Sequence, residues 1–351
     1  ATGVSDYIAL RRSRGVTVDN TLVVGGGGPI KKNHTFFFTN YDRNWFRTTA
    51  VPITTALAPE AFTTLRANNS LFAPGAVDFL ANSYPVANDP TPRGSLSVAL
   101  PDGRSIVLPI QQLSPGAVGY GTNFHRGLAK IDTRWGNNDT FSSRFLIDDN
   151  FDPGAPQAIV RNRVGSVSRN WSWTTNHVRT WSPSLVSESR FTWSTRDINF
   201  PNNLPFAFSI SGSGLPALGN QNFPQFRNDN VYEINNTQSW VKGKHNMRFG
   251  GQYLLYKLNS FFAPTFDGAV TYPSMADFLF DRNANFNRYA GNAQVDEPTH
   301  ELAFFLQDDY RITKALTLNL GVRYEYTSAP AGYYSNAKAD INNWAPRFGF
   351  A

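Results

Sequence analysis

Apolar residues occupy every second position of the eleven-residue segment Leu316–Tyr326. These positions are Leu316, Leu318, Leu320, Val322, Tyr324 and Tyr326. A period of two predicts a β-strand with one apolar face and one polar face. The segment is longer than most strands of soluble proteins. It has the length that a tilted strand needs to cross a membrane, about 9–11 residues.

Similar segments recur along the chain and predict further strands. They cover Gly15–Val24, Thr35–Phe46, Phe124–Trp135, Thr140–Asp148, Val164–Trp181, Leu185–Arg196, Val231–Val241, Asn246–Leu258, Glu301–Arg311 and a last segment from Trp344. Short turns are predicted at Pro29–Asn33, Gly136–Asp139, Ser182–Ser184, Lys242–His245 and Ile312–Ala315. Long segments lie between the resulting hairpins, at Arg47–Asn123, Asn150–Arg163, Asn199–Asn230 and Asn259–Thr299.

Short and long connections therefore alternate along the chain. This alternation is typical of up-and-down barrels, which have short turns on one side of the membrane and long loops on the other. The pattern predicts an all-β chain whose antiparallel strands belong to an up-and-down transmembrane β-barrel. The long loops are rich in Pro, Gly, Asn and Ser and are predicted to be irregular. The exception is a short helix over Ser274–Asp281 with Ser274 as its N-cap.

The composition agrees with a transmembrane β-barrel whose outer face contacts lipid. Aromatic residues make up 14% of the chain, and girdles of aromatic side chains at both membrane interfaces account for such an excess. A β-sandwich core also favours aromatic residues, so composition alone leaves both folds open. No apolar run approaches the length of a transmembrane helix, and the absence of cysteine excludes disulfides.

The net charge of +6 raises the question of nucleic-acid binding. Local basic clusters occur only at Arg11–Arg14 and Lys31–Lys32, and no nucleic-acid-binding motif accompanies them. We therefore expect no nucleic-acid partner.

Catalytic and metal-binding patterns are absent from the sequence. The five histidines have no metal-ligand spacing, and the doublets Asp148–Asp149 and Asp308–Asp309 place neighbouring carboxylates on opposite faces of a strand. Gly25–Gly28 lacks the Lys-Ser or Lys-Thr of a phosphate loop and is predicted to be a flexible strand end. Calcium binding by Asp148, Asp149 and Asp152 stays open. We expect no enzyme activity and no cofactor.

Charged residues on the polar faces are the candidate site. If the apolar faces meet lipid, the polar faces line the interior of the barrel, because a cation at mid-bilayer costs about 2–4 kcal/mol. The candidates for contact with a ligand or with a domain inside the barrel are Glu188, Arg190, Arg196, Arg323 and Glu325. Their alternative role is that of solvated residues of a wet lumen.

Several segments resemble the barrel of TonB-dependent outer-membrane receptors. The hairpin formed by Phe304–Thr313 and Leu316–Glu325 is similar to the family's Gln-Asp-Asp-Trp/Tyr-Arg hairpin and its return strand. The other similar segments are Gly27–Phe38, Asn40–Asp42, His245–Gly251 and Asn343–Gly349. The resemblance is greatest to the Oar-like group, whose members usually have an N-terminal carboxypeptidase-regulatory-like domain.

The resemblance implies a place in the outer membrane of a Gram-negative bacterium and energised uptake of a nutrient. A ligand, either a small molecule or a peptide or glycan, would bind outside the cell. The TonB complex would then pull on a plug domain of the parent chain. We expect residues 1–351 to be an internal fragment of the barrel, without plug, TonB box or signal peptide.

Two other functions remain open at this stage. A passive outer-membrane porin shares the barrel architecture but has no plug domain. A soluble all-β binding or adhesion module would instead have polar outward faces, unlike the apolar face of Leu316–Tyr326.

Overall fold

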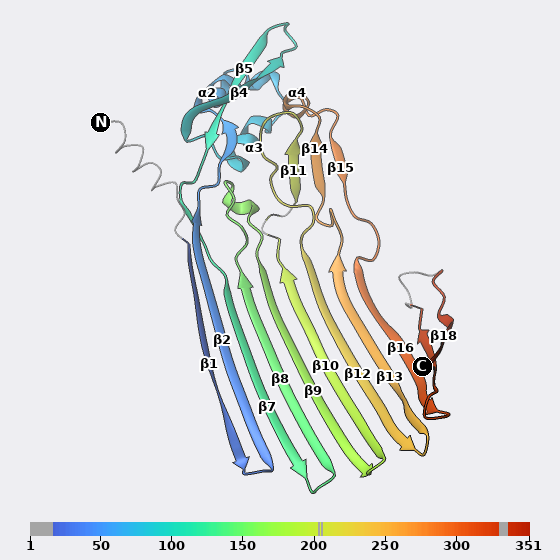
Figure 1. Cartoon of the computed structure of the whole chain (residues 1–351). Helices are drawn as coiled ribbons and strands as arrows, with labels where there is room; N and C mark the ends of the chain where they lie inside the picture. The colour runs from blue at the N-terminus through green and yellow to red at the C-terminus, as the bar shows by residue number, and fades with distance from the viewer. Residues whose placement is uncertain (1–16, 203, 205, 330–335) are drawn as a thin grey trace.

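The chain forms one broad, curved sheet of long antiparallel strands (Figure 1). The computed structural model describes residues 17–202, 204, 206–329 and 336–351, without the side chain of residue 160. The strands of the main sheet are β1 (Val18–Lys31), β2 (Thr35–Ala50), β7 (Asn123–Trp135), β8 (Asp139–Asp152), β9 (Ser166–Ser182), β10 (Leu185–Phe200), β12 (Gln225–Lys242), β13 (His245–Phe262), β16 (Gln294–Arg311), β17 (Thr317–Thr327) and β18 (Asp340–Phe350).

These strands pair in the order in which they follow one another along the chain, each antiparallel to the next. The predicted strands are confirmed, and most of them are longer than predicted. The short turns are confirmed too, except that the first lies at Lys32–His34, because Pro29–Lys31 belong to β1. The first strand begins at Val18 rather than Gly15, and residues 15 and 16 lie outside the described part, as do Arg11–Arg14. The short turns lie together at one end of the sheet, and the long connections leave from the other end (Figure 1).

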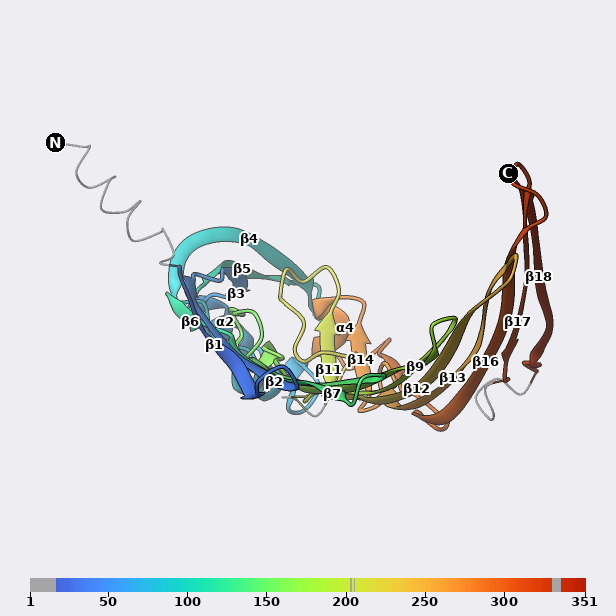
Figure 2. The ribbon, with the colours of Figure 1, turned by 60° about the horizontal axis from the view of Figure 1, so that its bottom comes forward.

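The sheet bends into an open trough and does not close on itself (Figure 2). Within the described residues, β1 pairs only with β2 and β18 pairs only with β17. The architecture is therefore that of a partial barrel, as the sequence predicted.

The glycine run Gly25–Gly28 differs from its prediction as a flexible strand end. It lies inside β1 and pairs in register with Phe37–Asn40 of β2. A Cβ atom at Gly27 would lie 2.5 Å from the carbonyl oxygen of Phe37 and 3.2 Å from the ring of Phe38. Glycine is thus required by a close approach of β2, and hydrogen bonds to β2 hold this segment in place.

The long connections are irregular only in part: Ser211–Gly214 is a turn, as the composition predicted, but helices and strands that were not predicted occur as well. The first connection contains β3 (Thr54–Leu57), α2 (Pro59–Ala67), η1 (Asn69–Leu71), α3 (Ala76–Ser83), β4 (Asp89–Ala99), β5 (Ser105–Leu113) and β6 (Val118–Tyr120). The later ones contain η2 (Val160–Asn162), β11 (Ala207–Ile210), β14 (Ala269–Tyr272), α4 (Met275–Leu279) and β15 (Asn285–Asn287). We call the unit built from 51–122, 201–224 and 263–293 the cap.

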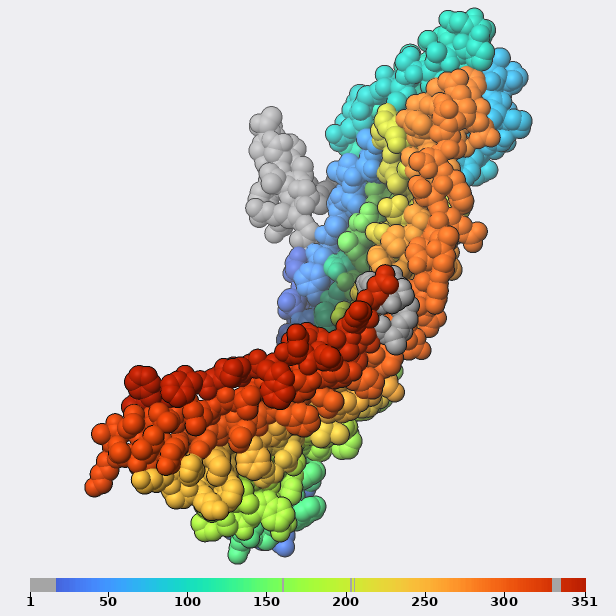
Figure 3. All heavy atoms as spheres, turned by 90° about the vertical axis from the view of Figure 1, so that its right-hand side faces the viewer, coloured from blue at the N-terminus to red at the C-terminus, as the bar shows by residue number. Residues whose placement is uncertain are grey.

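The cap has its own hydrophobic core, contributed by several connections. The largest fully buried side chains of the described chain all belong to it, at Leu57, Leu65, Val77, Leu80, Val98, Leu108, Ser213 and Leu279. Phe208 lies 4.8 Å from Phe79 and 5.6 Å from Phe278, measured between ring centroids. Strands β11 and β14 pair in parallel although they come from different connections. The segments around β4, β5 and α4 accordingly form one continuous mass (Figure 3).

The predicted short helix is confirmed as α4, with Ser274 as its N-cap. The Asp277 amide donates to Ser274 Oγ at 3.1 Å, and the Ser274 hydroxyl donates back to the Asp277 carboxylate. The Asn283 amide and Arg282 Nε also donate to that carboxylate, at 2.9 and 3.0 Å. Among the described helices, none has the length and apolar character needed to cross a membrane.

These contacts give the cap a predicted acid sensitivity. The hydrogen bond from Ser274, followed by those from Asn283 and Arg282, holds the pKa of Asp277 below its ordinary value. A carboxyl whose pKa is lowered by folding stabilises the folded state above its unfolded pKa and loses that contribution as the pH falls through the folded value. We expect the cap of Asp277→Asn to lose less stability than wild type between about pH 5 and pH 2. Proteolysis of the cap across this pH range measures the difference, and equal sensitivity would contradict the assignment.

Candidate functional site: the polar face of the curved sheet

The register of the strands sorts their side chains into two faces. Residues directly opposite one another share a face, and alternate residues along a strand change face. One row of paired positions crosses six strands through Asp42, Arg126, Asp148, Asn170, Arg196 and Asp229. We call the side of the sheet that contains this row the polar face and the opposite side the apolar face.

The polar face is the hollow side of the trough. A hollow of about 540 Å³ is lined mainly by polar-face residues, among them Asp148, Asn170, Arg196 and Asp229. Three further hollows along the sheet, of about 510, 380 and 90 Å³, are also lined mainly from this face. The concave surface is therefore wet and charged.

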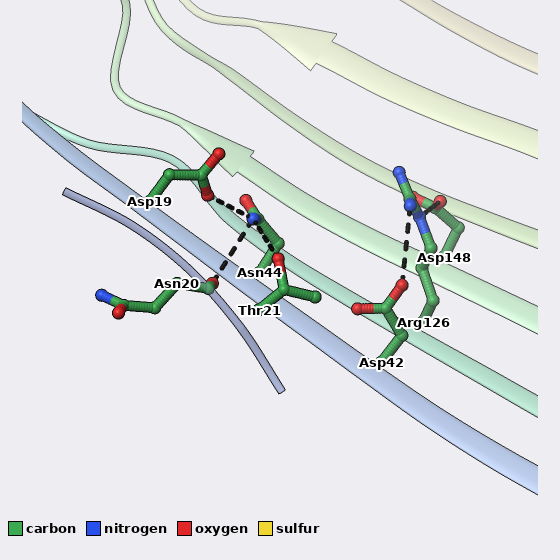
Figure 4. Close-up of polar contacts among 7 residues, drawn as sticks. All are labelled: Asp19, Asn20, Thr21, Asp42, Asn44, Arg126 and Asp148. Atoms are coloured by element: carbon green, nitrogen blue, oxygen red, sulfur yellow. Dashed lines mark hydrogen bonds and ion pairs between the residues drawn. The ribbon is translucent and has the colours of Figure 1, made fainter. Parts of the chain in front are cut away.

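Ion pairs and amide contacts hold the polar face together near the end that leads into the cap (Figure 4). Arg126 Nε donates to Asp148 at 2.9 Å, and its Nη1 lies 3.8 Å from a carboxylate oxygen of Asp42. The Asn44 amide donates to Asp19 at 2.6 Å and to the Thr21 hydroxyl at 3.0 Å. Because Arg126 is more than half exposed, each of its ion pairs contributes only about 0–1 kcal/mol. Their main effect is to orient the charges of the concave surface.

The five sequence-predicted candidates all fall on the polar face. Arg196 lines the hollow of about 540 Å³, and Arg323 and Glu325 line two smaller ones. Arg323 Nε donates to Glu325 at 2.6 Å, so these two form an ion pair. Glu188 and Arg190 lie on β10 opposite Thr237 and Asn235 of β12, away from these hollows. Contact of any of the five with a ligand stays a prediction.

Several charged residues of this face were not predicted from the sequence. The pairs formed by Asp42, Arg126 and Asp148 were not predicted, nor was the position of Asp229, which is only 8% exposed. The segment Phe124–Trp135 did contain a signal for a charged face. Its charged residues Arg126, Lys130, Asp132 and Arg134 are all at even-numbered positions and therefore lie on the same face of the strand. The partners themselves depend on register between strands, which a single strand does not reveal.

The acidic doublets divide between the two faces, as predicted. Asp148 pairs with Arg126 on the polar face, whereas Asp149 pairs with Arg169 at 2.7 Å on the apolar face. Asp152 accepts hydrogen bonds from Tyr120 and from the amide of Gly154. The three carboxylates considered for calcium thus have separate partners, and the described residues contain no cluster of three or more His, Cys, Asp or Glu side chains that could hold a metal ion.

The apolar face presents large hydrophobic side chains to the surroundings. The exposed ones include Ile131, Phe145, Trp173, Ile234, Phe304, Leu306, Leu320, Val322 and Phe348. A polar pair marks each end of this hydrophobic band. Asp149 pairs with Arg169 near the cap, and Asp308 pairs with His245 at 2.6 Å near the turns. A single sheet with one apolar and one wet face needs hydrocarbon on its apolar side.

Fold and faces together define a wall of an outer-membrane β-barrel. The profile of a family described as outer membrane beta barrel domain matches residues 7–338. The chain belongs to this family and lies in the outer membrane, which removes the soluble module from consideration. No curated protein matches the chain.

Two solved structures share the fold. The outer membrane transporter YddB from Escherichia coli is 11% identical with a TM-score of 0.56, and the match covers 95% of this chain and 36% of YddB. P. aeruginosa FpvA bound to heterologous pyoverdines is 9% identical with a TM-score of 0.53, covering 96% of this chain and 39% of FpvA. The chain thus spans well under half of the length of either protein.

Proposed function

We propose that this chain is part of the barrel wall of a TonB-dependent receptor of the Oar-like group, which imports a nutrient not yet identified. The observation that supports this most is the open arc of eleven paired strands with a charged concave face. A barrel completed from such an arc encloses a wide, wet lumen. Outer-membrane transporters of about 22 strands fill a lumen of that size with a plug.

Transport by this wall involves binding and gated passage, and no covalent bond changes. The ligand, a small molecule or a peptide or glycan, binds at the outer side. The TonB complex then moves the plug domain of the parent chain away from the polar face. In this proposal Glu188, Arg190, Arg196, Arg323 and Glu325 contact the plug or the ligand. The cap, built from the long connections that face outward in such barrels, stands over the entrance.

A passive porin is the second candidate, because it shares the amphipathic wall. The two proposals differ in permeability. A receptor with its plug in place keeps small solutes out, whereas a porin leaves an open aqueous channel.

The test uses the full-length protein that contains this chain. We expect it in the outer-membrane fraction with heat-modifiable gel mobility, and we expect liposomes that contain it to stay impermeable to arabinose. Rapid arabinose entry would favour the porin. Recovery as a soluble monomer without detergent would contradict both functions.

A further inference from the structure

A second hollow on the polar face is bordered by three arginines. It measures about 380 Å³ and lies over β13, β16, β17 and β18. Arg248, Arg323 and Arg347 border it, and Phe305 forms part of its wall. Gly321, which has no side chain, and Ala345, which has only a methyl group, leave its floor open.

The register explains why these arginines meet at one place. Arg248 pairs with Gln307, Gln307 with Gly321, and Gly321 with Arg347, so one row runs across four strands. Arg323 is two residues beyond Gly321 and therefore lies on the same face. A Cβ atom at Gly321 would have no neighbour closer than 3.6 Å, so the open floor is not imposed by crowding of the backbone.

Positive charge exceeds negative charge in this hollow. Arg323 is paired with Glu325. Within the described residues, Arg248 and Arg347 have no carboxylate within salt-bridge distance. Asp309, on the same side of β16, accepts a hydrogen bond from the neutral Asn319 amide at 2.6 Å and keeps its negative charge. Three guanidinium groups against the carboxylates of Glu325 and Asp309 leave a net positive charge that can attract an anion.

We propose that this hollow binds a carboxylate or phosphate group of the transported solute, an inference that rests on the proposed receptor function. Guanidinium groups bind both anions through paired, charge-assisted hydrogen bonds. Arginines that line a pore select anions in other channels. The arrangement therefore assigns the solute to the anionic class.

The test measures binding of citrate, a small tricarboxylate, to the full-length protein in detergent by calorimetry in a low-chloride buffer. We expect citrate to bind wild type and the double variant Arg248→Gln/Arg347→Gln to bind it about tenfold more weakly or worse. Lysine at both positions keeps the charge but not the planar fork and is expected to give an intermediate affinity. About 0.5 M sodium chloride should abolish binding in every case.

Arg144→Gln is the matched control, because it removes one cation from the same face on a distant strand. We expect its citrate affinity to stay within about twofold of wild type. Heat-modifiable mobility confirms that each variant is folded. Equal binding by wild type and the double variant would overturn the proposal, as would an equally large loss in Arg144→Gln. Absence of citrate binding by wild type would also overturn it, while leaving the receptor function to its own permeability test.

Discussion

An arginine in place of Ile234 is expected to prevent stable insertion of the sheet into the outer membrane. Ile234 lies in the middle of β12 on the apolar face, between Phe191 of β10 and Tyr253 of β13, and is 54% exposed. A cation at mid-bilayer costs about 2–4 kcal/mol, which is a large part of the stability of most proteins. Loss of the heat-modifiable form from the outer-membrane fraction measures this effect.

Asn235→Arg provides the matched control, since it introduces the same charge one residue further along the strand. Asn235 lies on the polar face, opposite Arg190 and Gln252 and two residues from Glu233. Water can solvate an arginine on that side, so we expect nearly normal insertion. Equal loss in both variants would show that the two faces do not differ as the register requires.

Replacing Phe208 with alanine is expected to unfold the cap while the barrel wall persists. The Phe208 ring is 5% exposed and packs against Phe79, Tyr84, Tyr272 and Phe278. Removing a buried phenylalanine costs about 3–5 kcal/mol. Because the described residues form no comparable core under the strands of the main sheet, the loss should be confined to the cap. Protease sensitivity of the cap, combined with unchanged heat-modifiable mobility, is the measurement.

Phe286→Ala is the control for this prediction. Phe286 belongs to β15, in the same small sheet as β11 and β14, but it is 62% exposed. Its loss leaves little cavity, so we expect protease resistance close to wild type. If Phe208→Ala were as resistant as Phe286→Ala, the cap would not depend on a common core.

The long strands could be predicted because each one has its own signal. A strand with lipid on one side and water on the other alternates at period two along its whole length, as Leu316–Tyr326 does. The short turns were equally clear, because turn residues interrupt this alternation. Strand ends were less clear: β13 runs to Phe262 rather than Leu258, because Asn259 and Ser260 followed by Phe261 and Phe262 do not alternate at period two.

The cap could not be predicted because its stability comes from contacts between distant connections. β11 and β14 are four residues each and pair across 62 positions of sequence, for example Ala207 with Ala269. Elements this short, within connections rich in Pro and Gly, do not reveal such pairing, and their common core makes them regular. Gly25–Gly28 was misjudged for a related reason, since its fit against β2 is invisible in β1 alone.

The candidate site was predictable in part, because alternate residues along a strand lie on the same face. Parity along a strand places Arg196, Arg323 and Glu325 on the polar face, and the register agrees. Which charges meet, such as Arg126 with Asp42 and Asp148, depends on the alignment of three strands. The alignment of neighbouring strands is set by the geometry of the turns and by the match of apolar and polar faces, so a single strand does not reveal it.

Single-cysteine labelling along β12 and β13 tests the central claim most directly, because the chain has no cysteine of its own. Cysteine would replace Ile234 and Tyr253 on the apolar face, and Asn235 and Gln252 on the polar face. We predict that a water-soluble thiol reagent labels positions 235 and 252 in the membrane-inserted protein, once any domain that fills the lumen is displaced. Positions 234 and 253 should stay unlabelled until the protein is denatured. Equal labelling of all four positions would contradict a barrel wall with one lipid face and one wet face.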